Sequence, residues 1–249
     1  MRFVLVLCML LASTSSLAEK TLTVLVGMDK PPYIQLQDGT GYELELLRAV
    51  FLDMGYHAIF LHVPKARIRY LLQLGHGDVA TLQGFAEPTT DLFYSMPYIR
   101  YQNAVITLKL RELQVQHSQD LARMSVIAFQ NANRVLGPDF AEMADASRRY
   151  QETTNQKTQV DMLLANRVDA VVMDINIFHY FRRGANDNQP IQLHSLFPAS
   201  EYRAAFRERG LQQAFDQAFA KLQRQEQYRQ LQLEFFGSVN QLIPADVTP

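Results

Sequence analysis

Apolar and polar positions divide the first third of the chain into alternating strands and helices. Residues 21–27 are apolar, rich in β-branched side chains and end at a glycine, which is typical of a buried strand. Residues 41–55 carry apolar side chains at helical spacing. The same patterns predict a strand over 57–63, a helix over 66–74 and a strand over 78–82. This alternation predicts a parallel sheet with helices on its faces.

The same alternation begins again in the second half of the chain. Apolar runs predict strands over 103–108, 125–129, 168–173 and 202–206. Helical spacing predicts helices over 118–124, 160–166, 211–219 and 226–235. The pattern therefore predicts two successive α/β units, each of roughly 100 residues.

Residues 1–18 have the pattern of a secretory signal peptide. Arg2 supplies a positive charge, ten apolar residues follow, and Ser16-Leu17-Ala18 offers small residues for cleavage after Ala18. The apolar run is shorter than the roughly 20 residues of a membrane helix. A buried N-terminal helix, the alternative, would alternate apolar and polar positions. Because Cys8 lies inside the apolar run and not after it, we expect a free periplasmic protein without a lipid anchor.

The amino-acid composition argues against several classes of function. Lys and Arg number 24 against 25 Asp and Glu, so net charge gives no reason to bind nucleic acid or an anionic membrane. The single cysteine excludes an internal disulfide and a cysteine-based zinc site. The six histidines have no metal-ligand spacing, and no second apolar run is long enough to span a membrane. We therefore expect no metal, no cofactor and no catalytic residues.

Two polar loops follow strands of the first unit. Asp29 and Tyr33 flank a Pro-Pro pair after the first strand, and Gln83, Gly84 and Phe85 follow the third. Open α/β sheets bind ligands at the carboxyl ends of their strands, so these residues are candidate ligand contacts. A structural turn with a surface tyrosine is the alternative for the first loop.

The second unit offers two comparable places. Asn131 and Asn133 follow the strand predicted over 125–129, where the start of a helix would leave backbone N–H groups free to bind an anion or a carbonyl. Asp174 ends an apolar strand, so its carboxylate must reach water or a cation. Helix capping is the alternative role for the Asn131–Asn133 segment and for Asp174.

Six segments, in order, resemble one family, the periplasmic solute-binding proteins of the polar amino acid uptake type (bacterial extracellular solute-binding proteins, family 3). They are TLTVLVGMDKPPY, GYEL at 41–44, LLQLGHGDVA, YSMPY at 94–98, LLANRVDAVVMD and the helix 228–236. The resemblance covers roughly residues 21–237. It implies an α/β, type II periplasmic-binding fold, with two lobes joined by two crossover strands around a ligand cleft. It places lobe 1 at 21–104 plus 203–249 and lobe 2 at 105–202.

The resemblance also assigns roles to the candidate residues. It implies that Tyr33 covers the solute, that the loop at 83–85 donates N–H groups to a carboxylate, and that Asp174 binds an ammonium group. The family clamps that carboxylate with an arginine, but Thr90 stands at the matching position here. Arg67, Lys65 and Arg134 are the possible substitute cations. The retained aspartate and the missing arginine suggest a solute that is cationic or amine-bearing and that need not carry a free carboxylate.

We therefore expect a monomeric periplasmic protein that binds a small polar solute, an amino acid or a related amine-bearing compound, for an inner-membrane ABC permease. Two alternatives remain open. One is an enzyme similar to cyclohexadienyl dehydratases, with Glu87 as the general acid. The other is a module that presents a ligand to a sensor protein.

Overall fold

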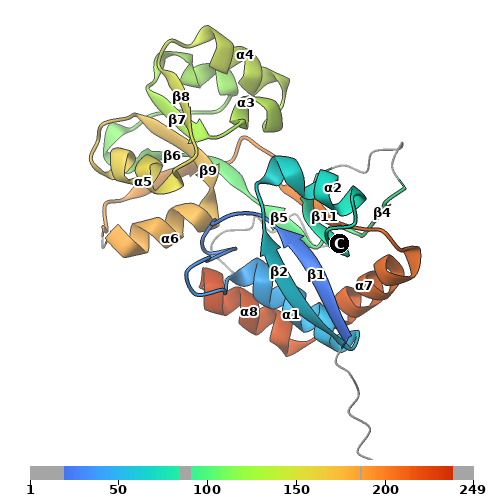
Figure 1. Ribbon diagram of the computed structural model, residues 1–249. Coiled ribbons are helices and arrows are strands. Elements are labelled where there is room, and N and C mark those ends of the chain that lie inside the picture. Colours follow the sequence, from blue (N-terminus) through green and yellow to red (C-terminus); the bar gives the residue numbers. More distant parts are fainter. Residues whose placement is uncertain (1–19, 85–90, 186, 238–249) are drawn as a thin grey trace, which may run out of the picture.

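The computed structural model describes residues 20–84, 91–185 and 187–237. It contains two separate sheets, each with helices packed against it, which build two lobes (Figure 1). The α/β class and the two-lobed architecture expected from the sequence are confirmed. The signal peptide lies outside the described residues, as do Phe85, Glu87 and Thr90.

The sheet of lobe 1 has the strand order β2-β1-β3-β11-β4. Strand β1 (Lys20–Val26) lies parallel to β2 (Tyr56–His62) and β3 (Val79–Gln83), as the alternating pattern predicts. The late strand β11 (Ser200–Phe206) returns antiparallel to β3, and the short strands β4 (Phe93–Tyr94) and β5 (Ile99–Tyr101) pair with it. Distant parts of the chain therefore share one sheet.

Helices cover both faces of this sheet. Helices α1 (Tyr42–Asp53), α7 (Arg209–Leu222) and α8 (Glu226–Phe236) pack together on one face around the aromatic cluster of Phe51, Phe206, Phe215 and Phe219. Helix α2 (Lys65–Gln73) covers the other face, with Ile68 and Leu72 against Leu25 and Ala80. Figure 1 places α2 on the part of lobe 1 that faces lobe 2.

Lobe 2 contains a second sheet with the order β10-β6-β9-β7-β8. Its strands are β6 (Asn103–Leu108), β7 (Val126–Phe129), β8 (Tyr150–Thr153), β9 (Ala170–Asp174) and β10 (Ile191–His194). Its helices are α3 (Ala132–Val135), α4 (Pro138–Ala146), α5 (Gln156–Leu164), α6 (Ile175–Ala185) and the 3-10 turns η1 (Lys109–Arg111) and η2 (Ser118–Arg123). Strand β9 is buried along its whole length, as its run of apolar residues predicts.

The structure adds elements that the sequence pattern did not predict. Strands β8 and β10 are only four residues long, and their side chains are mostly half-buried, so their alternation is weak. Helix α6 follows β9 directly, in a segment to which the apolar pattern assigned no element. The helix expected over 118–124 is a 3-10 helix, η2.

The chain passes between the sheets twice, after Tyr101 and between His194 and Ser200. The lobe boundaries expected from the sequence, at 104/105 and 202/203, fall inside β6 and β11. We retain a two-crossover division as a proposal and place it by strand pairing at residues 101–103 and 194–200.

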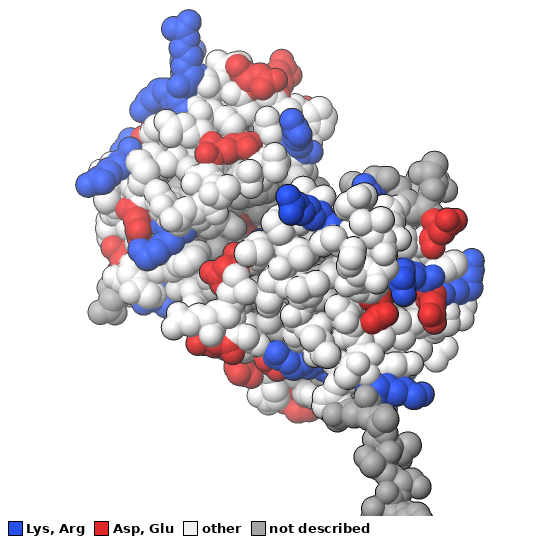
Figure 2. Space-filling model, viewed as in Figure 1, with Lys and Arg blue, Asp and Glu red and all other residues white. Residues whose placement is uncertain are grey.

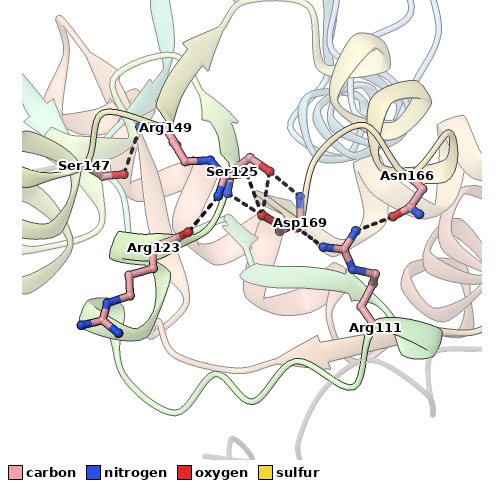
Figure 3. A network of polar contacts seen from close by, with 7 residues as sticks. All are labelled: Arg111, Arg123, Ser125, Ser147, Arg149, Asn166 and Asp169. Carbon is pink, nitrogen blue, oxygen red and sulfur yellow. Dashed lines mark hydrogen bonds and ion pairs between the residues drawn. The ribbon is translucent and has the colours of Figure 1, made fainter.

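One aspartate in each lobe ties together the amino ends of two parallel strands. Asp78 Oδ2 accepts a 2.8 Å hydrogen bond from the Thr23 N–H, just before β3. Asp169, just before β9, accepts from the Ser125 N–H at 2.7 Å and from the Ser125 hydroxyl at 2.8 Å (Figure 3). Arg111 and Arg149 also reach Asp169. These contacts give a structural role to Asp78 of the LLQLGHGDVA segment and to Asp169 of the LLANRVDAVVMD segment, at the strand ends opposite to the candidate ligand contacts.

Candidate functional site

The candidate ligand contacts lie where the two lobes face each other. The carboxyl ends of β1 and β3 in lobe 1 lead into residues 27–35 and 83–84, and those of β7 and β9 in lobe 2 lead into residues 130–134 and 174–176. Figure 2 shows a notch between the lobes, with acidic and basic side chains mixed over the visible surface. The fold therefore brings loops from both halves of the sequence to one cleft.

Tyr33 and Asp174 join the two lobes directly. The Tyr33 hydroxyl donates a 3.1 Å hydrogen bond to Asp174 Oδ1 and accepts one of 3.0 Å from Asn176 Nδ2. The Tyr33 side chain is only 1% exposed and packs against the rings of Tyr101 and Phe236. A nearby contact between the Tyr180 hydroxyl and Gln35 Oε1, at 3.2 Å, also crosses between the lobes.

Gly41 positions the loop that carries Tyr33. Its φ is +128°, a backbone angle that glycine adopts readily and other residues rarely do. A Cβ atom at this position would also collide with the Tyr33 carbonyl. The close approach lets the Tyr42 and Glu43 N–H groups, at the start of α1, donate to the carbonyls of Pro32 and Tyr33 at 2.9 and 3.0 Å. The first turn of α1 therefore holds the loop in place.

Asp174 is almost completely enclosed by donors from its own chain. Besides Tyr33, its carboxylate accepts from the N–H groups of Gln102, Asn176 and Ile177 at 2.9 to 3.1 Å. Burial raises its pKa to about 6, although these donors lower it in part. Asp174 therefore caps α6 and joins the lobes in this conformation, and its contact with a solute ammonium stays a prediction.

Asp29 and Arg67 both lie at the surface of lobe 1. Asp29 Oδ1 accepts a 2.9 Å hydrogen bond from the Leu36 N–H and so stabilises the loop between β1 and α1. Arg67 is exposed on the first turn of α2, close in sequence to Lys65. A role for either residue in ligand binding stays a prediction.

The end of β3 has an unusual backbone. Leu82 is buried with a φ of +56°, a left-handed conformation that is unfavourable for a branched side chain. The register of β3 with β11 is irregular there, and the half-buried Gln83 donates from its side-chain amide to the Thr81 carbonyl at 2.7 Å. Gly84 follows, next to the Tyr202 ring. Strained backbone of this kind concentrates at ligand sites, which supports Gln83 and Gly84 as candidates.

In lobe 2 the backbone donors of the 131–133 loop are already occupied. The Asn131 and Asn133 N–H groups donate to the two Glu152 oxygens at 2.6 and 3.0 Å. The Tyr150 hydroxyl donates to Glu152 at 2.7 Å, and these bonds hold the pKa of Glu152 below its ordinary value despite partial burial. The loop binds a carboxylate, but that carboxylate belongs to the protein, so a ligand contact of Asn131 or Asn133 stays a prediction.

A polar cluster beneath the lobe 1 side of the cleft was not predicted as a site. The carboxylate of Glu43 is fully buried and accepts a 2.5 Å hydrogen bond from the Tyr98 hydroxyl. Burial raises the pKa of Glu43, while Tyr98 and Lys30 oppose the shift. Lys30 comes from the Pro-Pro loop itself. A lysine between an aspartate and two prolines was visible in the sequence, but no spacing rule connects it to Glu43.

Two grooves are hollowed into the described surface. One of about 820 Å³ lies at the amino end of β1 beside α7. The other, of about 760 Å³, lies between the lobes, where the 32–40 loop of lobe 1 faces α6 of lobe 2, and Gln35 and Tyr180 are among its lining residues. None of the predicted ligand contacts lines either groove. Within the described residues, no three His, Cys, Asp or Glu side chains are grouped to hold a metal ion. No helix in those residues has the length and apolar character needed to cross a membrane.

Solved structures with this architecture support the fold. A histidine kinase sensor domain similar to periplasmic binding proteins matches with a TM-score of 0.68 and 21% identity, over 88% of this chain and 97% of its own. An ancestral amino acid-binding protein, a precursor of cyclohexadienyl dehydratase, matches with a TM-score of 0.66 and 19% identity. The match covers 87% of this chain and 95% of that protein.

An amino acid ABC transporter substrate-binding protein from Streptococcus pneumoniae, bound to L-arginine, matches with a TM-score of 0.64 and 20% identity, over 87% of this chain and 94% of its own. At these identities the likeness establishes the fold, which is the type II periplasmic-binding fold expected from the sequence.

Sequence comparison identifies the family. No sequence among curated proteins matches this chain. The family model described as bacterial extracellular solute-binding proteins, family 3, matches residues 22–238, nearly the whole chain after the predicted signal peptide. The match covers both lobes and all the described candidate residues. The chain therefore belongs to the bacterial extracellular solute-binding proteins, family 3.

Proposed function

We propose that the protein binds a small polar solute, an amino acid or a related amine-bearing compound, in the cleft between its lobes and delivers it to an ABC permease. The observation that carries this proposal is the Tyr33–Asp174 contact, which joins the carboxyl ends of β1 and β9 across the lobes. Residues that meet in this way exchange partners when a solute enters or leaves the cleft. The family match supports the same class of function.

A thermal-shift screen tests this proposal. The solute-free protein is mixed with amino acids, polyamines and small carboxylates, and hits are confirmed by calorimetric titration. A solute at 100 times its Kd stabilises the bound form by about 2.7 kcal/mol, which raises Tm by several degrees. We expect one chemical class to give this shift with one site per chain. No saturable binding by any class would overturn the proposal.

We also propose that the mature protein acts in the periplasm, since the predicted signal peptide precedes a chain of an extracellular solute-binding family. Mass spectrometry of protein isolated from the periplasm tests this, with Glu19 expected as the first residue. A full-length chain starting at Met1 in the cytoplasm would contradict it.

A sensor role is the second candidate, because a histidine kinase sensor domain shares the fold over 97% of its length. Delivery to a permease and presentation to a sensor use the same cleft. Solute uptake by cells that lack the protein distinguishes them: loss of uptake supports transport, and unchanged uptake with a lost transcriptional response supports sensing.

A third candidate, turnover of a small carboxylated ring, is motivated by the dehydratase precursor that shares the fold. Incubation of the purified protein with prephenate or arogenate tests it directly. A product that accumulates in proportion to enzyme concentration would replace the binding proposal with a catalytic one.

A further inference from the structure

Two lysines flank one pair of tyrosines on the lobe 1 side of the cleft. Lys30 Nζ lies 4.9 Å from the centre of the Tyr101 ring, and Lys65 Nζ lies 4.7 Å from the centre of the Tyr202 ring. The two rings are 5.4 Å apart and meet edge to face. Lys30 and Lys65, which are 35 positions apart in the chain, are thus brought to the same surface as Gly84 at the end of β3.

Neither lysine is held in a close ion pair with a described residue, although the carboxylate of Glu43 acts on both and that of Asp174 acts on Lys30. Among the described residues, neither ammonium group has a carboxylate within 4.0 Å, although contact with the tyrosine rings stabilises both. Burial and the charge of Lys30 lower the pKa of Lys65 to about 8, opposed by Glu43. Burial also lowers the pKa of Lys30, opposed by Glu43 and Asp174. Two ammonium groups that repel each other beside a cleft favour an anion between them.

Buried polar atoms lie in the same cluster. The Tyr101 hydroxyl is buried without a hydrogen-bond partner and belongs to the ring that Lys30 covers. Glu43 and Thr81 lie beside each other, and the contact with Thr81 lowers the pKa of Glu43 in part. Buried polar groups are nearly always hydrogen-bonded in native proteins, so the Tyr101 hydroxyl has capacity for a further partner.

Lobe 2 shows the opposite situation. The N–H groups of Asn131 and Asn133 are bound by Glu152, and the Asp174 carboxylate accepts from four donors of its own chain. Among the cleft groups that the structure describes, the two ammonium groups without a close ion pair therefore lie in lobe 1.

We propose that the solute carries a carboxylate group, and that Lys30 and Lys65 bind this group over the Tyr101–Tyr202 pair. The site deepens the proposed function and depends on it. Lobe 1 supplies the charge recognition, and lobe 2 closes over the remainder of the solute. The Tyr101 hydroxyl is positioned in the same cluster as a further donor. Lys65 and not Arg67 is the α2 residue that takes part.

Matched pairs of compounds test the requirement for a carboxylate. L-ornithine with putrescine, L-lysine with cadaverine and L-arginine with agmatine differ only by that group, and succinate with succinamide covers solutes without an amine. We expect binding by the carboxylate member of at least one pair and affinity at least about tenfold lower for its counterpart, the difference of a charge-assisted contact. Binding of a decarboxylated amine as tightly as the acid would overturn the carboxylate site while leaving the solute-binding function intact. Absence of binding by any compound would overturn both.

Variants of the two lysines test the location. For the compound that binds, Lys65→Met and Lys30→Met are each expected to raise Kd at least about tenfold, whereas Lys65→Arg stays within about threefold of the parent. Lys109→Met, which removes a surface charge in lobe 2, serves as the matched control and leaves Kd unchanged. Circular dichroism and Tm identify variants that do not fold, and Lys65, on the first turn of α2, supplies the decisive comparison if Lys30→Met does not fold. Unchanged affinity in folded Lys65→Met would overturn the inference.

Discussion

The Tyr33 hydroxyl donates to Asp174 across the two lobes, at 3.1 Å and 141 positions apart in the chain. Both side chains are nearly inaccessible to water, and the same hydroxyl accepts from Asn176. These hydrogen bonds connect the two lobes directly. A movement of one lobe against the other must therefore lengthen or break the Tyr33–Asp174 bond. This bond couples the stability of this conformation to the arrangement of the lobes.

Removing the Tyr33 hydroxyl tests that coupling. Tyr33→Phe keeps the ring but leaves Asp174 with one donor fewer and Asn176 without its acceptor. We expect the free energy of unfolding of the solute-free protein to fall by about 1–3 kcal/mol in urea denaturation. Tyr70→Phe, at a side chain that is 62% exposed, is the control and should change it by less than about 0.5 kcal/mol. Equal effects of the two substitutions would contradict a role for the Tyr33 hydroxyl.

The titration of Asp174 predicts a pH dependence of stability. Its pKa is raised from 3.8 to about 6 in the folded protein, so the folded state holds a proton between those pH values that the unfolded state has released. Protonation of Asp174 therefore adds about 3 kcal/mol to the free energy of unfolding. This contribution is fully present below pH 4 and is lost as the pH rises through 6. Asp174→Asn cannot titrate, so the difference in free energy of unfolding between parent and variant should change in this direction between pH 4 and 7. A difference that is flat with pH would show that the folded and unfolded pKa values are equal.

The two strand-end aspartates are expected to differ in importance. Asp169 receives two bonds from Ser125 and ion pairs with Arg111 and Arg149, whereas Asp78 receives one bond from Thr23, with Arg207 more distant at 3.9 Å. We expect Asp169→Asn to lower the free energy of unfolding by about 2–4 kcal/mol and Asp78→Asn by about 1 kcal/mol. Urea denaturation compares them directly. A larger loss for Asp78→Asn would reverse this ranking.

Solute affinity should depend on the protonation of Lys65. With a pKa of about 8 in the free protein, and with Lys30 and Glu43 as the facing charges, Lys65 loses its proton above that pH. Affinity for a carboxylate is then expected to be constant below pH 7 and about tenfold weaker at pH 9, measured by calorimetry. In Lys65→Arg the charge persists, so the pH dependence should be much smaller. The same decline in both proteins would assign the dependence to another group.

The sequence predicted what local periodicity encodes. The apolar run of β9 and the glycine-terminated run of β1 identified buried strands, and the rule for strand carboxyl ends placed Tyr33 at the ligand-binding edge of the first unit. The family resemblance implied that Asp174 faces the same cleft. The direct hydrogen bond between Tyr33 and Asp174 could not be predicted from the sequence, because its geometry depends on the relative position of the lobes.

Two further features depended on tertiary pairing. Glu152 reaches the 131–133 loop because the register of β7 and β8 places Ala128 opposite Glu152. Lys30 and Lys65 approach through loops after β1 and β2, which are neighbours only in the folded sheet. Neither relationship has a local sequence signal, since each depends on strand order and register.

Mapping of backbone amide shifts by NMR tests the central claim most directly. The protein is titrated with the compound that gives the largest thermal shift. The account predicts saturable changes from both lobes, at residues 27–35 and 83–84 of lobe 1 and at 130–134 and 174–176 of lobe 2. Changes confined to the outer surface of one lobe, with the Tyr33 and Asp174 amides unaffected at saturation, would contradict binding between the lobes.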